Sequence, residues 1–569
     1  MPPPTVQVRT TRDEKLGQNQ QIEIALSLII GVIVGLVVVA FILLTGRLSA
    51  RMYPPESSGL RRLLTPVLGA LVTGYLLFRY FPEARGSGIP QTKFALFIRD
   101  GYMSLRSVLG KFICCSGSLA SGIALGREGP SVQIGAGIAS VLGRRFGLPP
   151  NRIRALVPVG CSAALAAAFN TPIAAVLFSL EEILGDLHAP VLGSVVIASA
   201  TSWMTLHLIL GDEPLFHVPA YQLLSPAEFL IYGVLGVVGG IGSVVFVKLL
   251  LWIRTWFKRL PARNAWLYPA AGGLTVGLLG LFMPEVLGVG YDYVERVLGG
   301  DMALRTVIIL AILKIIATAM SYSSGNAGGI FGPSLFIGAM IGGAVGSVAH
   351  SLFPAWTANP GAYALVGMGT AFAGIVRTPF TSVIMIFEMT RDYSVIVPLM
   401  ISNLISYFVS AQLQPKSIYE ALAEQDGVHL PGAEAREHIG RNQVSSVMRD
   451  LSLASATTIA DAARLFKESK VNSLPVTHDG RVIAVIGASQ IGKAASLGIA
   501  SAGELVGEGS AIQSVYPDQP LSLALERMGA AGVDAIPVVS REHARTYLGT
   551  VTLSEVLQSY GIQSDGAIQ

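Results

Sequence analysis

Long apolar stretches dominate the first three quarters of the chain. Residues 24–44 form a run of 21 residues without a charged side chain, and a helix needs about 20 residues to cross the hydrocarbon core of a bilayer. Similar stretches follow at 63–79, 155–180, 189–211, 226–253, 266–285, 305–320, 335–353, 361–387 and 394–413. This pattern predicts an all-α polytopic membrane domain.

The pattern changes after residue 419. A polar stretch leads into short apolar runs with ordinary charge, and residues 473–491 resemble residues 535–556, 62 positions later. Each copy has the pattern helix, strand, strand, helix, which predicts a soluble α+β region of two similar units. The predicted division is an N-terminal segment 1–22, a membrane domain 23–419, a linker 420–443 and two soluble units, 444–503 and 504–562.

The membrane domain contains an internal duplication. GREGPSVQIGA (126–136) matches GIFGPSLFIGA (329–339), 203 residues later, and VGCSAALAAAFNTP (159–172) matches VGMGTAFAGIVRTP (366–379), 207 residues later. Two matches in the same order predict repeats at about 60–210 and 230–419. Many transporters consist of inverted repeats joined by broken helices, with the substrate at the repeat interface near the membrane midplane. We expect that arrangement here, although the sequence leaves the inversion itself open.

The glycine-proline loops of the duplication predict an anion site. Pro130 suits the first turn of a helix, and the N–H groups before it would be unpaired in lipid, where each costs several kcal/mol. A helix N-terminus also carries about half a positive charge, which attracts anions. The copy at 329–333 provides a second such terminus, and Gly86–Pro90 a third. A single break of this kind is more often a kink, but three favour the anion site.

Glu128 lies inside the first loop and is itself an anion. Deprotonated, it can occupy the site, and protonated, it should leave, so that anion binding and proton binding become linked. A buried carboxylate costs roughly 2.5–3.5 kcal/mol or more at the membrane centre, which argues for a function. The alternative is a structural ion pair with Arg127, disfavoured because adjacent residues on a helix do not face each other.

The three loops, GSGIP (86–90), GREGP (126–130) and GIFGP (329–333), resemble the signatures of the CLC family of chloride channels and chloride/proton exchangers. The soluble units resemble a pair of cystathionine β-synthase (CBS) domains. The resemblance implies a homodimer with a pore in each subunit, and Glu128 as its gating and proton-coupling glutamate. It implies chloride binding by Ser87, Gly88, Ile89, Arg127, Gly129, Ile330, Phe331 and Tyr419. Without the resemblance, Tyr419 would read equally well as an interfacial aromatic residue.

Glu182 decides between an exchanger and a channel. The resemblance makes Glu182 an internal proton-handling glutamate, where most channels have an apolar residue. The repeat aligns Glu181 with Glu388 but Glu182 with Met389, so the first looks architectural and the second functional. We predict exchange of chloride for protons, Ser87 favouring chloride. A passive voltage- or pH-gated chloride channel is the alternative, in which Glu182 is only a solvated carboxylate at a helix end.

The resemblance to CBS domains implies an adenine-nucleotide site. The family pattern places a hydroxyl residue and an acid after the second strand, which corresponds to Thr552 and Glu555 in the second unit, with Glu in place of Asp; the first unit lacks both. The alternative, which we favour, is a packing and dimerisation module. We expect no cofactor to be required.

Composition limits the other classes. Charged residues make up 13% of the chain, its mean hydropathy is +0.58 and its net charge is only +4, so we expect a lipid bilayer and no nucleic acid as a partner. The eight histidines and three cysteines show no catalytic or metal-ligand spacing. A divalent-cation transporter would need clustered carboxylates instead of helix N-termini. Basic residues before the first span predict cytoplasmic termini, in a plasma or inner membrane.

Overall fold

The structure is a computed structural model in two units, residues 1–430 and 431–569. It describes residues 8–54, 57–187, 189–212, 214–216, 218–219, 221, 224–428, 443–506, 512–517, 519–540 and 545–560. For residues 8–20 and 495–497 it describes the backbone alone.

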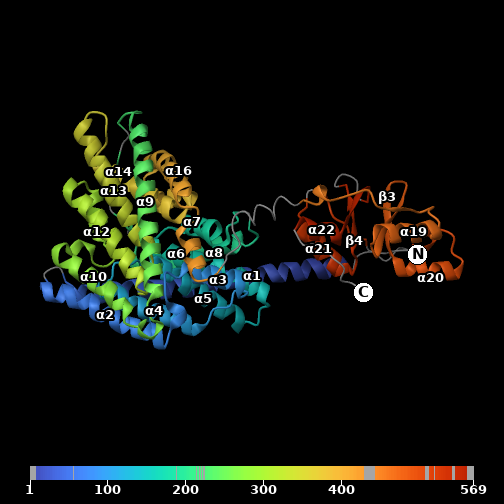
Figure 1. The fold of residues 1–569 in the computed structure, drawn as a ribbon, viewed down its shortest axis with the longest axis horizontal. Helices are drawn as coiled ribbons and strands as arrows, with labels where there is room; N and C mark the ends of the chain where they lie inside the picture. Colours follow the sequence, from blue (N-terminus) through green and yellow to red (C-terminus); the bar gives the residue numbers. More distant parts are fainter. Residues whose placement is uncertain are drawn as a thin grey trace. The chain divides into compact units, whose positions relative to one another are not determined.

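The first unit is a helical bundle (Figure 1). Among the described helices, eight are long and apolar enough to cross a membrane, as the hydropathy pattern predicts. The main helices are α1 (Val8–Met52), α2 (Gly59–Arg79), α3 (Ile89–Ile98), α4 (Leu105–Ala120), α5 (Glu128–Arg145), α6 (Pro150–Phe169), α7 (Pro172–Phe178), α8 (Leu192–Leu210), α9 (Glu228–Arg259), α10 (Tyr268–Phe282), α11 (Tyr291–Leu298), α12 (Leu304–Ser323), α13 (Phe331–Leu352), α14 (Pro360–Val376), α15 (Pro379–Thr390), α16 (Ile396–Leu413) and α17 (Ile418–Gln425).

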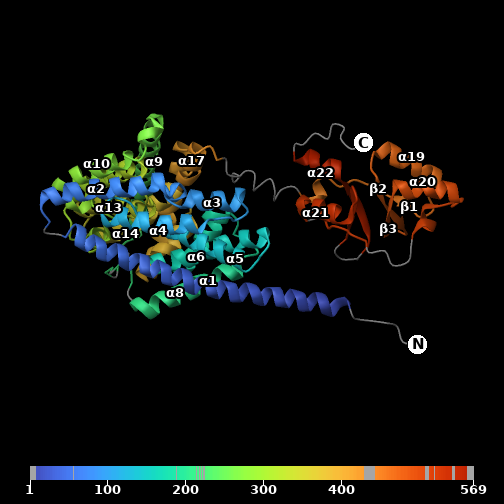
Figure 2. The ribbon, with the colours of Figure 1, turned by 90° about the horizontal axis from the view of Figure 1, so that it is seen from below.

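The two repeats pack in the same way. α5 packs on α6 as α13 packs on α14, and both contacts depend on glycine. A Cβ on Gly135 would lie 2.2 Å from the carbonyl oxygen of Gly160, and one on Gly338 would lie 2.3 Å from that of Gly367. Backbones without side chains between them can approach closely in a membrane. α2 and α10 lie side by side in Figure 1 and Figure 2.

A reciprocal backbone contact relates the repeats. Gly126 donates to the carbonyl of Gly329 and Gly329 donates to the carbonyl of Gly126, both at 2.7 Å, and the two segments run antiparallel there. Equivalent residues that exchange hydrogen bonds in opposite directions are related by a local twofold axis. The contact therefore fits the expected inverted repeats.

Two predicted boundaries differ from the observed helices. The predicted N-terminal segment 1–22 includes the first turns of α1, which begins at Val8, and the predicted linker 420–443 includes the last turns of α17, which ends at Gln425. In both places the helix continues past the end of the apolar pattern. Residues 429–442 of the predicted linker lie outside the described residues.

The second unit is α+β, as predicted. β2 (Ser473–His478) pairs antiparallel with β3 (Arg481–Gly487) and parallel with β1 (Leu453–Ala454), while β4 (Ala535–Val539) pairs antiparallel with β5 (Tyr547–Thr552). Each sheet has its own apolar core. The covering helices are α19 (Ile459–Ser469), α20 (Ala488–Leu497), α21 (Leu521–Ala531) and α22 (Leu553–Ser559).

Candidate anion site

Three helices begin within contact distance of one another. α3 begins at Ile89, α5 at Glu128 and α13 at Phe331. Beyond the exchange between Gly126 and Gly329, a Cβ on Gly129 would lie 2.5 Å from the carbonyl oxygen of Ser87. The structure therefore brings the three predicted loops together, and the positive ends of their helices act on one place.

The side chain of Glu128 occupies this place. It has no exposed surface, its Oε2 accepts a hydrogen bond of 3.2 Å from the N–H of Gly332, and its Oε1 accepts one from the hydroxyl of Tyr291. A Cβ on Gly126 would lie 2.3 Å from Oε2, so the glycine of the motif leaves room for the carboxylate. A carboxylate thus accepts a backbone N–H at the start of the other repeat's helix, as an anion would.

Arg127 is the residue before α5 and has helical backbone dihedral angles, so it adjoins Glu128 at the start of the helix. Its Nε lies 4.0 Å from Oε1 of Glu128, at the limit of an ion pair, and its guanidinium lies 5.7 Å from the ring centre of Tyr291. Arg127 therefore lies beside the carboxylate as a weak partner.

Several predicted chloride donors have no partner in the described part of the chain. The hydroxyls of Ser87 and Tyr419 are fully buried and make no hydrogen bond there, although Tyr322 is a polar neighbour of Ser87. The backbone N–H groups of Ile330 and Phe331 also make none within the described residues. Buried polar groups without partners are rare in proteins, so these donors fit a bound anion.

Not every predicted donor is free. The N–H of Gly88 donates to Oε1 of Gln91 at 2.9 Å. Gly88 instead takes a φ of +101°, which favours glycine, and lets α3 begin at Ile89. Gly129 serves the close contact between loops.

An aromatic cluster fixes the backbone of Phe331. Its ring lies 4.8 Å from that of Phe169, 5.5 Å from that of Phe178 and 4.3 Å from that of Phe372. Such contacts hold the ring in one orientation, and therefore also the N–H groups at the start of α13.

The two neighbouring glutamates contact different elements. Glu181 accepts hydrogen bonds from the N–H groups of Phe380 and Thr381 at the start of α15. Glu388 accepts them from Ile173 and Ala174 at the start of α7. This exchange confirms the architectural interpretation of the duplicated pair.

Glu182 points to another element. Its Oε1 accepts a hydrogen bond of 2.8 Å from Nζ of Lys93 on α3, and both side chains are nearly buried. Residues 179–184 form a π-helical turn, a distortion often found at functional sites. The hydroxyl of Tyr419 lies within electrostatic range of both Glu182 and Glu128. Lys93 was not predicted, and a basic residue three positions after Pro90 was the available signal.

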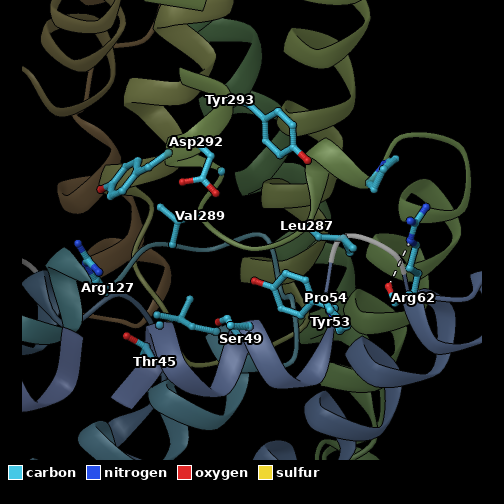
Figure 3. Close-up of a pocket in the computed structure, with 17 residues that line it drawn as sticks. Thr45, Ser49, Tyr53, Pro54, Arg62, Arg127, Leu287, Val289, Asp292 and Tyr293 are labelled. Carbon is cyan, nitrogen blue, oxygen red and sulfur yellow. Dashed lines mark hydrogen bonds between the residues drawn. The ribbon is translucent and has the colours of Figure 1, made fainter. Parts of the chain in front are cut away.

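Two cavities approach the site from opposite ends of α2. The first, about 460 Å³, is lined by Arg62 near the start of α2 and by Arg127 and Tyr291 (Figure 3). The second, also about 460 Å³, is lined by Leu77 near the end of α2 and by Gly86. Figure 3 shows the first cavity between α1, with Thr45 and Ser49, and the segment from Leu287 to Tyr293. The buried loops thus lie between two cavities, each large enough for several water molecules.

The predicted nucleotide residues are engaged with each other. Thr552 and Glu555 form the capping box that begins α22, and Oε1 of Glu555 lies 2.7 Å from Nε of Arg449. The acid is therefore already paired. No group of three potential metal ligands occurs among the described residues.

Comparison with known proteins agrees with this geometry. The voltage gated chloride channel family model matches residues 69–411, well over half of the chain. The chain belongs to this family, the CLC family. CBS domain models match residues 444–495 and 510–561, so the multi-pass membrane domain of this CLC protein is followed by a CBS pair.

Relatives show how close the match is. A putative ClcB-like chloride channel protein of Ralstonia nicotianae is 35% identical over 384 residues, 66% of this chain and 89% of that protein. The H(+)/Cl(-) exchange transporter ClcA of Vibrio campbellii is 33% identical, over 62% of this chain and 77% of that protein. The crystal structure of a slow cyanobacterial Cl-/H+ antiporter is 27% identical, with a TM-score of 0.66, over 71% of this chain and 97% of that one.

Proposed function

We propose that this CLC protein is a secondary active transporter that exchanges chloride for protons. The observation that carries the proposal is the carboxylate of Glu128, fully buried and hydrogen-bonded to the N–H of Gly332 at the start of the other repeat's helix. A titratable side chain in an anion site links proton binding to anion binding. The named exchangers among the relatives support the same activity.

The proposed cycle follows from competition for one place. The deprotonated carboxylate blocks the path between the two cavities. Chloride displaces it and takes the free donors, the hydroxyls of Ser87 and Tyr419 and the N–H groups of Ile330 and Phe331. The displaced carboxylate takes a proton at the first cavity, which Arg127 lines, and gives that proton up toward Glu182 when it re-enters the site.

Glu182 is the proposed proton site on the other side. It is nearly buried and paired with Lys93, so its charge is compensated while it holds no proton. Lys93 lies on α3, the helix that begins directly after the Ser87 loop. We propose that protons and chloride part here, because chloride leaves past Ser87 whereas protons pass Glu182.

The protein is proposed to act as a homodimer in a plasma or inner membrane, with both termini cytoplasmic. Ile173 and Phe380 are equivalent residues of α7 and α15 and are 57% and 64% exposed, so the exchanged caps of Glu181 and Glu388 lie beside an apolar surface that a second subunit would cover. Cysteine cross-linking at these two positions in native membranes tests the interface.

For the CBS pair we propose a packing role rather than nucleotide sensing. The pairing of Glu555 with Arg449 and Thr552 removes the acid that would bind ribose. Titration of the full-length protein with ATP should show no saturable heat. Saturable binding that a Glu555→Ala variant loses would instead assign an adenine-nucleotide site there.

Flux from proteoliposomes tests the exchange. Wild-type protein should drive protons against their gradient when chloride flows, and Glu128→Ala should pass chloride without moving protons. Glu388→Gln is a matched control, because it alters a half-buried carboxylate outside the anion site. Chloride flux without any proton movement by the wild type would favour the alternative, a passive chloride channel.

A further inference from the structure

The repeat extends to a loop that the motifs do not mark. Gly288-Val289-Gly290 precedes α11 as Gly86-Ser87-Gly88 precedes α3, 202 residues earlier. All four glycines have positive φ, +77° and +101° in the first loop and +61° and +84° in the second. The start of α11 is therefore the second repeat's copy of the start of α3.

Each loop is held by an equivalent buried lysine, one from each repeat. Nζ of Lys111 donates to the carbonyls of Ala84 and Gly86 at 2.9 and 2.7 Å. Nζ of Lys314 donates to those of Val286 and Gly288 at 3.1 and 2.7 Å. Both lysines are fully buried and lie 203 residues apart, so the second loop is as firmly placed as the first.

The helix that follows the second loop places a hydroxyl beside the Glu128 carboxylate. Tyr291, the first residue of α11, donates to Oε1 of Glu128, whereas Ile89, at the equivalent place in the first repeat, has no polar side chain. The ring of Phe216 packs edge-on against Tyr291 at 5.5 Å. A bond from a neutral donor to a carboxylate is stronger than one between neutral groups.

We propose that Tyr291 is a positioning residue that holds the Glu128 carboxylate in the anion site and so sets how readily chloride displaces it. The proposal rests on the exchange proposed above, and adds a group from the second repeat to the gate. The other charged or titratable side chains that face Glu128 are Arg127, Cys115 and Tyr419. Within the described residues, none of these three side chains donates a hydrogen bond to the carboxylate. The side-chain donor there is Tyr291, beside the backbone N–H of Gly332.

Chloride affinity tests the proposal directly. Tyr291→Phe removes only the hydroxyl, and the purified variant should bind chloride roughly tenfold more tightly in calorimetry, since a hydrogen bond to a charged group is worth about that factor or more. Tyr293→Phe is the control, because Tyr293 lines the same cavity (Figure 3) on the same helix. It should bind chloride as the wild type does.

A double-mutant cycle separates positioning from structure. In a Glu128→Ala background, Tyr291→Phe should leave chloride affinity unchanged, because there is no carboxylate to hold. An unchanged affinity in the wild-type background, or an equal shift in both backgrounds, would overturn the proposal.

A second variant tests the proposal even if Tyr291→Phe fails to fold. Incorporation of 3-fluorotyrosine at position 291 keeps the shape and strengthens the donor, so chloride should bind more weakly than in the wild type; tighter or equal binding contradicts the proposal. Proton movement by wild-type vesicles is measured in parallel. Its absence would overturn the exchange and leave the comparison of chloride affinities standing.

Discussion

The two halves of the membrane domain share their scaffold and differ in their chemistry. Three devices occur in both repeats: the exchanged glycine hydrogen bonds, the exchanged carboxylate caps and the buried lysines under the loops. Their members are Gly126 and Gly329, Glu181 and Glu388, and Lys111 and Lys314.

The differences gather around the anion site. Glu128 of the first repeat corresponds to Phe331 of the second, and Glu182 to Met389. A contact that occurs in both repeats supports the symmetric scaffold. A side chain that occurs in only one repeat makes the two ends of the transport path different. Duplication therefore separates structural from functional acids within a single sequence.

Making the repeats alike at Glu182 should have the largest effect. Lys93→Met with Glu182→Met replaces the ion pair by apolar side chains, one of them the residue found at the equivalent position. Proton transport in vesicles should disappear while chloride flux and folding persist. Undiminished proton transport by the double variant would show that Glu182 is only a helix-end carboxylate.

The single variant Glu182→Met is the informative partner. It leaves Lys93 as an uncompensated buried charge, a change that costs about 3–5 kcal/mol in proteins. The thermal unfolding temperature in detergent should therefore be lower for the single variant than for the double variant.

The lysines should behave as equivalent supports. Lys111→Met and Lys314→Met each leave two buried carbonyls without a donor, at about 1–3 kcal/mol per group. The thermal unfolding temperature in detergent should fall by similar amounts in the two variants. A large loss for one lysine alone would break the comparison, because it would make the two loops mechanically different.

The exchanged caps should behave alike and stay out of transport. Glu181→Gln and Glu388→Gln each weaken the hydrogen bonds at a helix start, where an acidic group is worth about 0.5–2 kcal/mol. Both variants should unfold slightly earlier and keep their proton-to-chloride ratio. A changed ratio in Glu181→Gln alone would assign that residue to the proton path.

The CBS pair offers the smallest test of the same principle. Thr552 and Glu555 form a capping box in the second unit, and Gly487 with Gln490 occupies the same place in the first. Thr552→Ala should cost about 1 kcal/mol of stability, seen by thermal unfolding, without changing chloride flux. A change in flux would show that the second unit acts on the pore.

Much of the scaffold could be predicted from the sequence. Lipid requires long apolar helices with internal hydrogen bonds, so hydropathy marks them, and the glycine-proline motifs mark where helices break. The split between Glu181 and Glu182 could be predicted from the family resemblance together with the alignment of the repeats. The structure places these two acids against different elements.

The contacts across the site could not be predicted, because they join residues far apart in sequence. Tyr291 and Lys314 lie in a part of the repeat where only alternate glycines and one lysine are kept, too little to recognise without coordinates. The pairing of Lys93 with Glu182 could not be predicted, because the two residues lie 89 positions apart in the sequence.

Proton uptake on chloride binding tests the central claim most directly. The purified wild-type protein is placed in weakly buffered detergent with a pH indicator, and it should take up protons as chloride is added. The reason is that chloride displaces the Glu128 carboxylate into the first cavity, which Arg127 and Tyr291 line, and the carboxylate becomes protonated there. Glu128→Ala should bind chloride without proton uptake. Chloride binding by the wild type with no proton uptake would contradict competition between the carboxylate and the anion for one site.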